Sequence, residues 1–174
     1  DATLPGERAH GKLIEAGGTL YWIGGQNDAG TAQSDVYYAV PDSSTGNIAS
    51  WATASNGLPS ARSQFGAAEW NDRLYVVAGI NSGGTVQNTV YYSPALSSTS
   101  SGGNIGSAWT SSTAPDVARS GNAVVAYANN LYSFGGFDGT NYLNDAQFTQ
   151  INSDGSVDAW TFTTALPTRL RQAE

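Results

Sequence analysis

The sequence contains no cysteine and no methionine, and histidine occurs once, at His10. The missing cysteines exclude disulfide bonds, thiolate metal sites and thiol nucleophiles, and the missing methionines remove another target of oxidation. A Ser-His-Asp triad would have to use His10, and no Gly-x-Ser-x-Gly turn accompanies it. The sequence therefore gives no support for hydrolase chemistry of this kind.

Basic residues are also scarce. Lysine and arginine total 7 against 14 acidic residues, so the formal charge is −7, and Lys12 is the single lysine. Such a surface repels phosphate backbones and anionic lipids, and no apolar run reaches membrane-spanning length. We expect no nucleic-acid partner and no membrane insertion.

The remaining composition is rich in Ser, Thr, Asn and Gly, which is typical of secreted bacterial surface proteins. We therefore expect an extracellular or cell-surface location. Because the chain begins with Asp1, we expect a processed product or a piece of a longer chain.

An internal repeat is the main feature of the sequence. The strand-like segment Gly18–Gly25 recurs as Asp72–Gly79 and as Asn129–Gly136, so that the central tyrosines lie 54 and 57 residues apart. Three further landmarks keep the same phase, namely a Leu-Pro or Ala-Pro pair before an arginine, a Val-Tyr-Tyr strand, and a Gly-Ile/Val-Trp segment. Aromatic and β-branched clusters alternate with Gly, Asn, Asp and Ser turns, which predicts four short strands per repeat. In the first repeat we expect strands near 11–16, 19–24, 34–40 and 48–54.

These landmarks resemble the kelch repeat family, through the Gly-Gly pair after a Leu-Tyr strand, the arginine-led segment before it, and the later Tyr and Trp. The second repeat departs from the pattern with Ala78-Gly79 in place of two glycines, and Trp109 lies one residue late. The resemblance implies an all-β propeller in which each repeat forms a four-stranded blade around a channel. It places the repeats at about 6–60, 61–116 and 117–167, and leaves 168–174 to start a fourth repeat or to cross to a partner.

Three blades cannot close a ring, because propellers have four to eight. Each end blade should expose an apolar flank of roughly 800 Å², which is larger than monomers tolerate. We expect either a piece of a larger propeller or a homodimer of two three-blade arcs that forms a six-bladed ring. The first five residues match Thr163–Pro167 in phase, and Arg171 then repeats Arg8, so head and tail would compete for one position.

The arginine of each repeat is the first candidate for a binding role, since Arg62 and Arg119 at a channel mouth could clamp carboxylates or phosphates. The alternative is that each arginine ties one blade to the next. Two residues after each arginine lie His10, Gln64 and Gly121, and in kelch-like binding proteins this position can face the entrance pocket. The variation there favours His10 and Gln64 as polar groups that line a pocket.

The loops after the inner strands differ in sequence but have similar lengths, and loops on a repeated scaffold carry function. Amide, acidic and aromatic side chains in them could contact a sugar or peptide. The alternative is turn chemistry, for which Asn and Asp are suited. The candidates are Asn27, Asp28, Asn81, Phe137, Asp138, Asn141 and Tyr142.

Metal and cofactor chemistry finds no support. No segment has the spaced carboxylates of a calcium loop, and kelch copper oxidases need two histidines where this chain has one. Ser153-Asp154-Gly155 before Trp160 departs in spacing from the turn of propeller sialidases.

Two sugar-processing alternatives stay open, a carboxylate pair for glycoside cleavage and a mutarotase site. The sequence assigns no residues to either of them.

The sequence therefore predicts a non-catalytic recognition or scaffold module that binds a protein or glycan through propeller-face loops and assembles by blade-to-blade pairing. The alternative is a purely structural arc that self-assembles into rings or fibres. No cofactor is expected.

Overall fold

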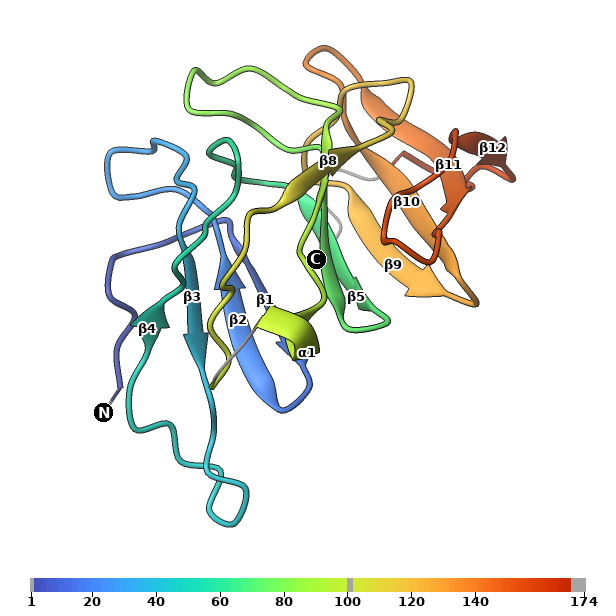
Figure 1. Cartoon of the computed structure of the whole chain (residues 1–174). Coiled ribbons are helices and arrows are strands. Elements are labelled where there is room, and N and C mark those ends of the chain that lie inside the picture. The colour runs from blue at the N-terminus through green and yellow to red at the C-terminus, as the bar shows by residue number, and fades with distance from the viewer. Residues whose placement is uncertain (1, 100–101, 170–174) are drawn as a thin grey trace.

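The computed structural model describes residues 2–99 and 102–169, and these form three four-stranded antiparallel sheets. The sheets fan out side by side, with their first strands toward the centre (Figure 1). Blade 1 consists of β1 (Lys12–Ala16), β2 (Thr19–Ile23), β3 (Val36–Ala39) and β4 (Ala52–Thr53). Blade 2 consists of β5 (Gly66–Trp70), β6 (Arg73–Val77), β7 (Val90–Tyr92) and β8 (Thr110–Ser112). Blade 3 consists of β9 (Ala123–Tyr127), β10 (Asn130–Phe137), β11 (Tyr142–Gln150) and β12 (Thr161–Thr163).

Each blade is a meander whose strands pair in sequence order. The first two strands are joined by a two-residue turn, and in blade 1 Gly17 and Gly18 adopt φ angles of 57° and 81°. This backbone matches the right-handed twist of the strands, which is why glycine and asparagine favour it. The same turn closes the inner hairpin in the other two blades, through Asn71-Asp72 and Ala128-Asn129.

Two apolar cores hold the blades together. Tyr21 and Ile23 of blade 1 share a core with Leu74 and Val76 of blade 2. One residue further along, the opposite face of blade 2 buries Tyr75 and Val77 in a second core with blade 3. Because strand side chains alternate between faces, blade 2, which lies between the other two, uses both faces for packing. Trp109 and Trp160 are buried in these cores, as expected of residues that recur with the repeat.

Backbone hydrogen bonds join the blades at their seams. Between blades 1 and 2, the Gly25 N–H donates to Arg62 O over 2.8 Å and the Arg62 N–H donates to Gln33 O over 3.0 Å. Between blades 2 and 3 the same bonds join Gly79 to Arg119 and Arg119 to Gln87. The same main-chain hydrogen bonds therefore join the blades at both seams.

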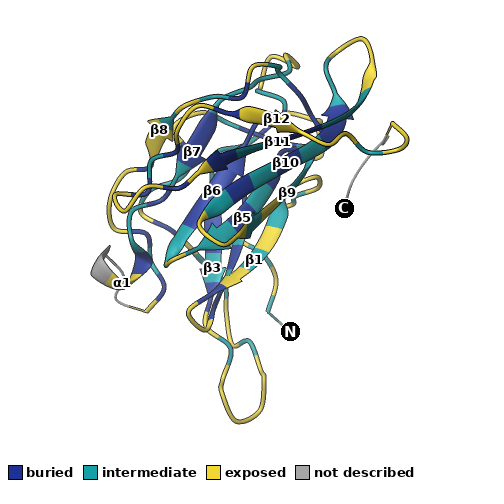
Figure 2. Cartoon of the chain, turned by 90° about the vertical axis from the view of Figure 1, so that its right-hand side faces the viewer, coloured by how far each residue is buried: buried dark blue, intermediate teal, exposed yellow. Residues whose placement is uncertain are grey.

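The flank of blade 3 has no neighbouring blade among the described residues, and Figure 2 looks onto this blade from outside. The Tyr132 ring stacks with Phe134 and Phe148 on this flank. On the inner strand Val125 is 49% exposed and Tyr127 is 70% exposed. In blade 2 the residues equivalent to Tyr132 and Phe134, Tyr75 and Val77, are fully buried. The open flank is thus an uncovered copy of an internal interface.

The sequence predicted the all-β propeller segment and its three four-stranded blades, and the structure confirms both. One element was not expected, the single helical turn α1 (Leu96–Thr99) between β7 and β8. None of the helices among the described residues is long and apolar enough to cross a membrane. Arg171 and most of the proposed start of a fourth repeat lie outside the described residues.

Candidate functional site on the loop face

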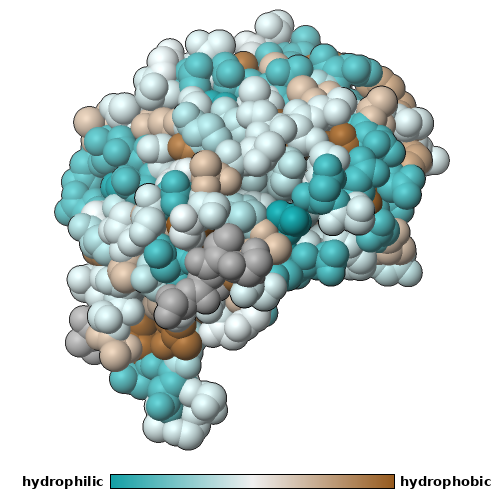
Figure 3. Space-filling model, viewed as in Figure 1, coloured by the Kyte–Doolittle hydropathy of each residue, from teal (hydrophilic) through white to brown (hydrophobic). Residues whose placement is uncertain are grey.

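Three loops lie at the same end of the blades and form what we call the loop face (Figure 1). They connect β2 to β3, β6 to β7 and β10 to β11. The space-filling view shows a mixture of hydrophilic and near-neutral residues over this end, with hydrophobic residues in small areas (Figure 3). All of the predicted loop residues lie on this face.

Asn27, Asn81 and Asp138 hold their own loops in shape. Asn81 Oδ1 accepts hydrogen bonds from the N–H groups of Gly83 and Thr85, both over 3.0 Å. Asn27 Oδ1 accepts one from Thr31 N, again over 3.0 Å. These bonds are the turn chemistry expected of asparagine and aspartate.

Asp138 repeats this pattern in blade 3. Its Oδ1 accepts from the N–H groups of Thr140 and Asn141 over 2.7 and 2.6 Å. The Asn141 and Thr140 amides hold the pKa of Asp138 below its ordinary value, because they stabilise the ionised form. In the first loop, by contrast, Asp28 faces Glu7, and their hydrogen bond and like charges raise the pKa of Glu7.

A second set of loop residues forms the rim of this face. In each blade two residues pair across the base of the loop, as Gln26 with Ala32, Ile80 with Val86, and Phe137 with Tyr142. The rim therefore changes from polar in blade 1 to aliphatic in blade 2 and aromatic in blade 3.

The aromatic end of the rim is well defined. The ring centroids of Phe137 and Tyr142 lie 5.0 Å apart with a 43° tilt, and Tyr142 is 38% exposed. Val86 lies beside the tip of this loop, since a Cβ on Gly139 would be 3.8 Å from it. Sequence reasoning found Phe137 and Tyr142 but missed Ile80 and Val86, although they occupy the same repeat positions.

The two candidate arginines are buried, with 1% of Arg62 and 0% of Arg119 exposed. Arg62 Nη2 donates to Thr89 Oγ1 and to the Tyr91 hydroxyl, over 2.6 and 3.0 Å. Arg119 donates to both carboxylate oxygens of Asp145 over 2.9 and 2.8 Å. The main-chain groups of these arginines bond to the preceding blade, whereas their side chains bond within their own blade, so the arginines join blades through the main chain. A binding role for Arg62 and Arg119 stays a prediction.

His10 and Gln64 lie in the segments that lead into the first strands, β1 and β5, of their blades. Both have left-handed backbones, with φ of 55° and 51°, and Gly121 shares this conformation with φ of 63°. The Gln64 N–H donates to His10 O over 2.9 Å and the Gly121 N–H donates to Gln64 O over 2.6 Å. The position therefore has a backbone role that allows the side chain to vary, and variation alone does not indicate a pocket. The pocket-lining role of His10 and Gln64 stays a prediction.

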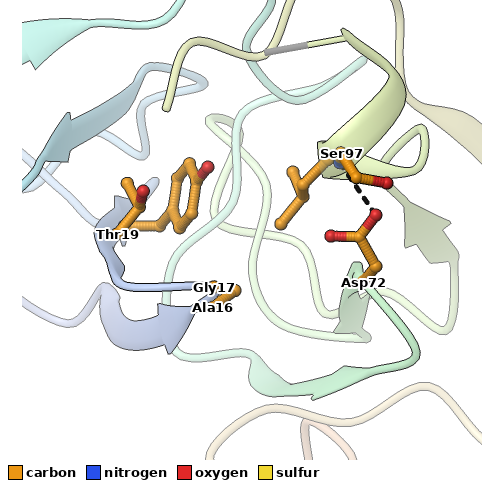
Figure 4. Close-up of a pocket in the computed structure, with 7 residues that line it drawn as sticks. Ala16, Gly17, Thr19, Asp72 and Ser97 are labelled. Atoms are coloured by element: carbon orange, nitrogen blue, oxygen red, sulfur yellow. Dashed lines mark hydrogen bonds between the residues drawn. The ribbon is translucent and has the colours of Figure 1, made fainter. Parts of the chain in front are cut away.

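The opposite end of the blades, which we call the turn face, carries the β1–β2, β5–β6 and β9–β10 turns. A hollow of about 160 Å³ lies there between blades 1 and 2. Figure 4 shows Ala16, Gly17 and Thr19 on one side of it and Asp72 with Ser97 on the other. Asp72 Oδ2 accepts from the Ser97 N–H over 2.8 Å, which fixes the start of α1 over this hollow.

No group of three or more His, Cys, Asp or Glu side chains that could hold a metal ion occurs in the described part of the chain. Two of the partly buried acidic side chains bind arginines, since Asp35 binds Arg8 and Asp145 binds Arg119. Two others, Glu69 and Asp72, accept main-chain N–H groups. The site therefore presents hydrogen-bonding loops and an aromatic rim.

Comparisons with known proteins agree with this geometry. Residues 118–147 match the kelch motif. The fold superposes on the solved structure of YjhT with a TM-score of 0.71 and 15% sequence identity, over 96% of this chain and 55% of that one. The chain thus spans about half the length of this structural neighbour. No curated protein sequence matches the chain. The chain carries a kelch motif and is a three-blade arc of a kelch-type β-propeller.

Proposed function

We propose that the chain is a non-catalytic recognition and scaffold module that binds a protein or glycan on its loop face. Such propellers bind partners on the faces where their loops gather. The observation that carries the proposal is the Phe137–Tyr142 pair, with centroids 5.0 Å apart at the edge of the rim.

The chemistry of the rim supports this function. Aromatic side chains that stand partly in solvent supply much of the affinity at protein and sugar interfaces. Asp138 and Asn81 use their side chains to fix the loops, so the face is preorganised and little entropy is lost on binding. Ile80 and Val86 extend the apolar surface next to the aromatic pair.

The test is retention of the purified chain on protein and glycan arrays. Phe137→Ala should reduce retention at least tenfold. Phe162→Ala, at an exposed phenylalanine of β12 outside the loop face, should leave it near wild type and serves as the matched control. Equal retention by the wild type and Phe137→Ala would refute the loop-face site. Gln64→Ala in the same assay tests whether the predicted pocket position before β5 contributes.

A second candidate is structural, namely an arc that assembles through its open flanks. It is favoured by the uncovered aromatic stack of Tyr132, Phe134 and Phe148. Two arcs related by a twofold axis would bury this flank against blade 1 of the partner and complete six blades.

The tail bears on this assembly. The Leu166 N–H donates to Asn144 O over 2.7 Å, as the Leu58 N–H donates to Ser34 O at the first seam. The tail thus enters the position that a partner's first residues would take. If a second copy closes the ring, either the tail of one chain or the first residues of its partner must move aside. If further blades of the same chain close the ring, neither has to move. An extracellular location remains part of the proposal and rests on composition alone.

A further inference from the structure

A second hollow lies on the turn face, at the seam between blades 2 and 3. Its volume is about 430 Å³, and it is lined by Glu69 and Trp70 from the end of β5, Asn71 from the turn that follows, and Asn129 from the turn before β10. None of these residues belongs to the loop face. The hollow is large enough for one sugar ring.

Trp70 is held in place across the seam. Its indole Nε1–H donates to Asn129 Oδ1 over 3.1 Å, and Asn129 Nδ2 donates to Ile151 O over 2.8 Å. The blade fold does not require an indole here, because Ala16 holds the equivalent register position in blade 1. The indole is therefore a feature of this one seam, and it is positioned by the next blade.

Two polar residues that line the hollow with Trp70 retain unused hydrogen-bonding capacity. Glu69 Oε1 accepts from the Asp72 N–H over 3.0 Å, while its Oε2 makes no hydrogen bond to any described residue. The Asn71 side chain is exposed and likewise makes none within residues 2–99 and 102–169. Glu69 and Asn71 thus line the same hollow as Trp70 and keep polar atoms for a ligand.

We propose that this hollow binds one pyranose ring of a neutral oligosaccharide. The apolar face of a pyranose stacks on an aromatic ring, and its hydroxyls donate to carboxylate and amide oxygens, as in sites that combine an apolar wall with a few polar groups. Glu69 and the net charge of −7 disfavour acidic sugars. This site is independent of the loop face, so either proposal can fail alone.

The experiment uses the five tryptophan indole N–H signals of the whole chain in a two-dimensional NMR spectrum, with the Trp70 signal assigned from Trp70→Phe. Cellotriose and chitotriose are the probes. We expect one of them to shift the Trp70 signal saturably, with a dissociation constant of about 1 mM. Failure of both to shift this signal would overturn the proposal.

Variants locate the site. Asn71 has a φ of 49°, which glycine adopts without strain, so Asn71→Gly keeps the fold and removes the amide. Asn71→Gly and Glu69→Gln should each weaken binding about fivefold or more, and Phe137→Ala should leave it unchanged. Unchanged binding in both hollow variants would refute the site. Loss of binding in 0.5 M NaCl would also overturn it, because that dependence indicates an ionic ligand.

Discussion

Arg119 and Asp145 form a two-point ion pair inside blade 3, with Nη1 and Nη2 of the guanidinium 2.9 and 2.8 Å from the two carboxylate oxygens. The arginine side chain is fully buried, and 22% of the aspartate side chain is exposed. In blade 1 the corresponding Arg8–Asp35 pair leaves 43% of the aspartate exposed. The same pair therefore occurs in two environments.

This contrast predicts the cost of losing each carboxylate. Asp145→Asn should lower the free energy of unfolding by about 3 kcal/mol, because it leaves a buried guanidinium with neutral partners only, among them the carbonyls of Val117 and Gly135. Asp35→Asn is the matched control and should cost under about 1 kcal/mol. Urea titration of both variants measures the difference. Equal losses would contradict the buried-pair account.

The same pair predicts a dependence on pH. Burial raises the pKa of Asp145, but hydrogen bonds from Arg119 and Gln147 outweigh it and the net pKa is lowered below 3.8. A lowered carboxyl pKa contributes stability that is fully present above the ordinary value and is lost as pH falls through the folded-state pKa. The stability gap between wild type and Asp145→Asn should thus be constant from pH 5 to 7 and shrink below about pH 4. A gap that widened with acid would be inconsistent with this sign.

Alanine substitutions at two glycines distinguish the cost of backbone strain from the cost of steric crowding. Gly25 and Gly30 both have positive φ, 94° and 75°. A Cβ on Gly25 would lie 2.6 Å from Ala9 O, whereas nothing lies within 4 Å of one on Gly30. Gly30→Ala should cost about 1 kcal/mol from the backbone alone, and Gly25→Ala about 3 kcal/mol or more because the seam must also open. Thermal unfolding of both variants tests this order.

The open flank predicts self-association. If arcs pair through blade 3, Tyr127→Glu should shift the chain toward monomer in sedimentation velocity, since it places a charge on the flank. Phe162→Glu is the control, because Phe162 is also exposed but pairs with Gln147 and so faces the other side of the sheet. A wild-type chain that stays monomeric at high concentration would exclude the closed dimer.

The blades could be predicted from sequence because their signals are local. The Leu-Tyr strands, their glycines and the later tryptophans each lie within one repeat, and the structure places them as expected. The helical turn at Leu96 could not be predicted, because four residues are too few to show the repeating apolar pattern of a helix.

The sites were harder to predict because they depend on contacts between repeats. Trp70 meets Asn129 across 59 residues of sequence, and no spacing rule joins them. The variation among His10, Gln64 and Gly121 predicts a pocket, and the structure shows only their shared left-handed backbone, so that prediction remains to be tested. Ile80 and Val86 could have been found by comparing the same strand-end position in all three repeats.

The seam bonds between Gly25, Arg62 and Gln33 have a consequence for how such chains grow. Their donors and acceptors are main-chain atoms, so a duplicated blade forms the same hydrogen bonds with its new neighbour whatever side chains stand at these positions. Recombination can then lengthen or shorten the array one blade at a time. The loops and turns at the two ends are free to diverge afterwards, which makes each copy a site for acquiring a new specificity.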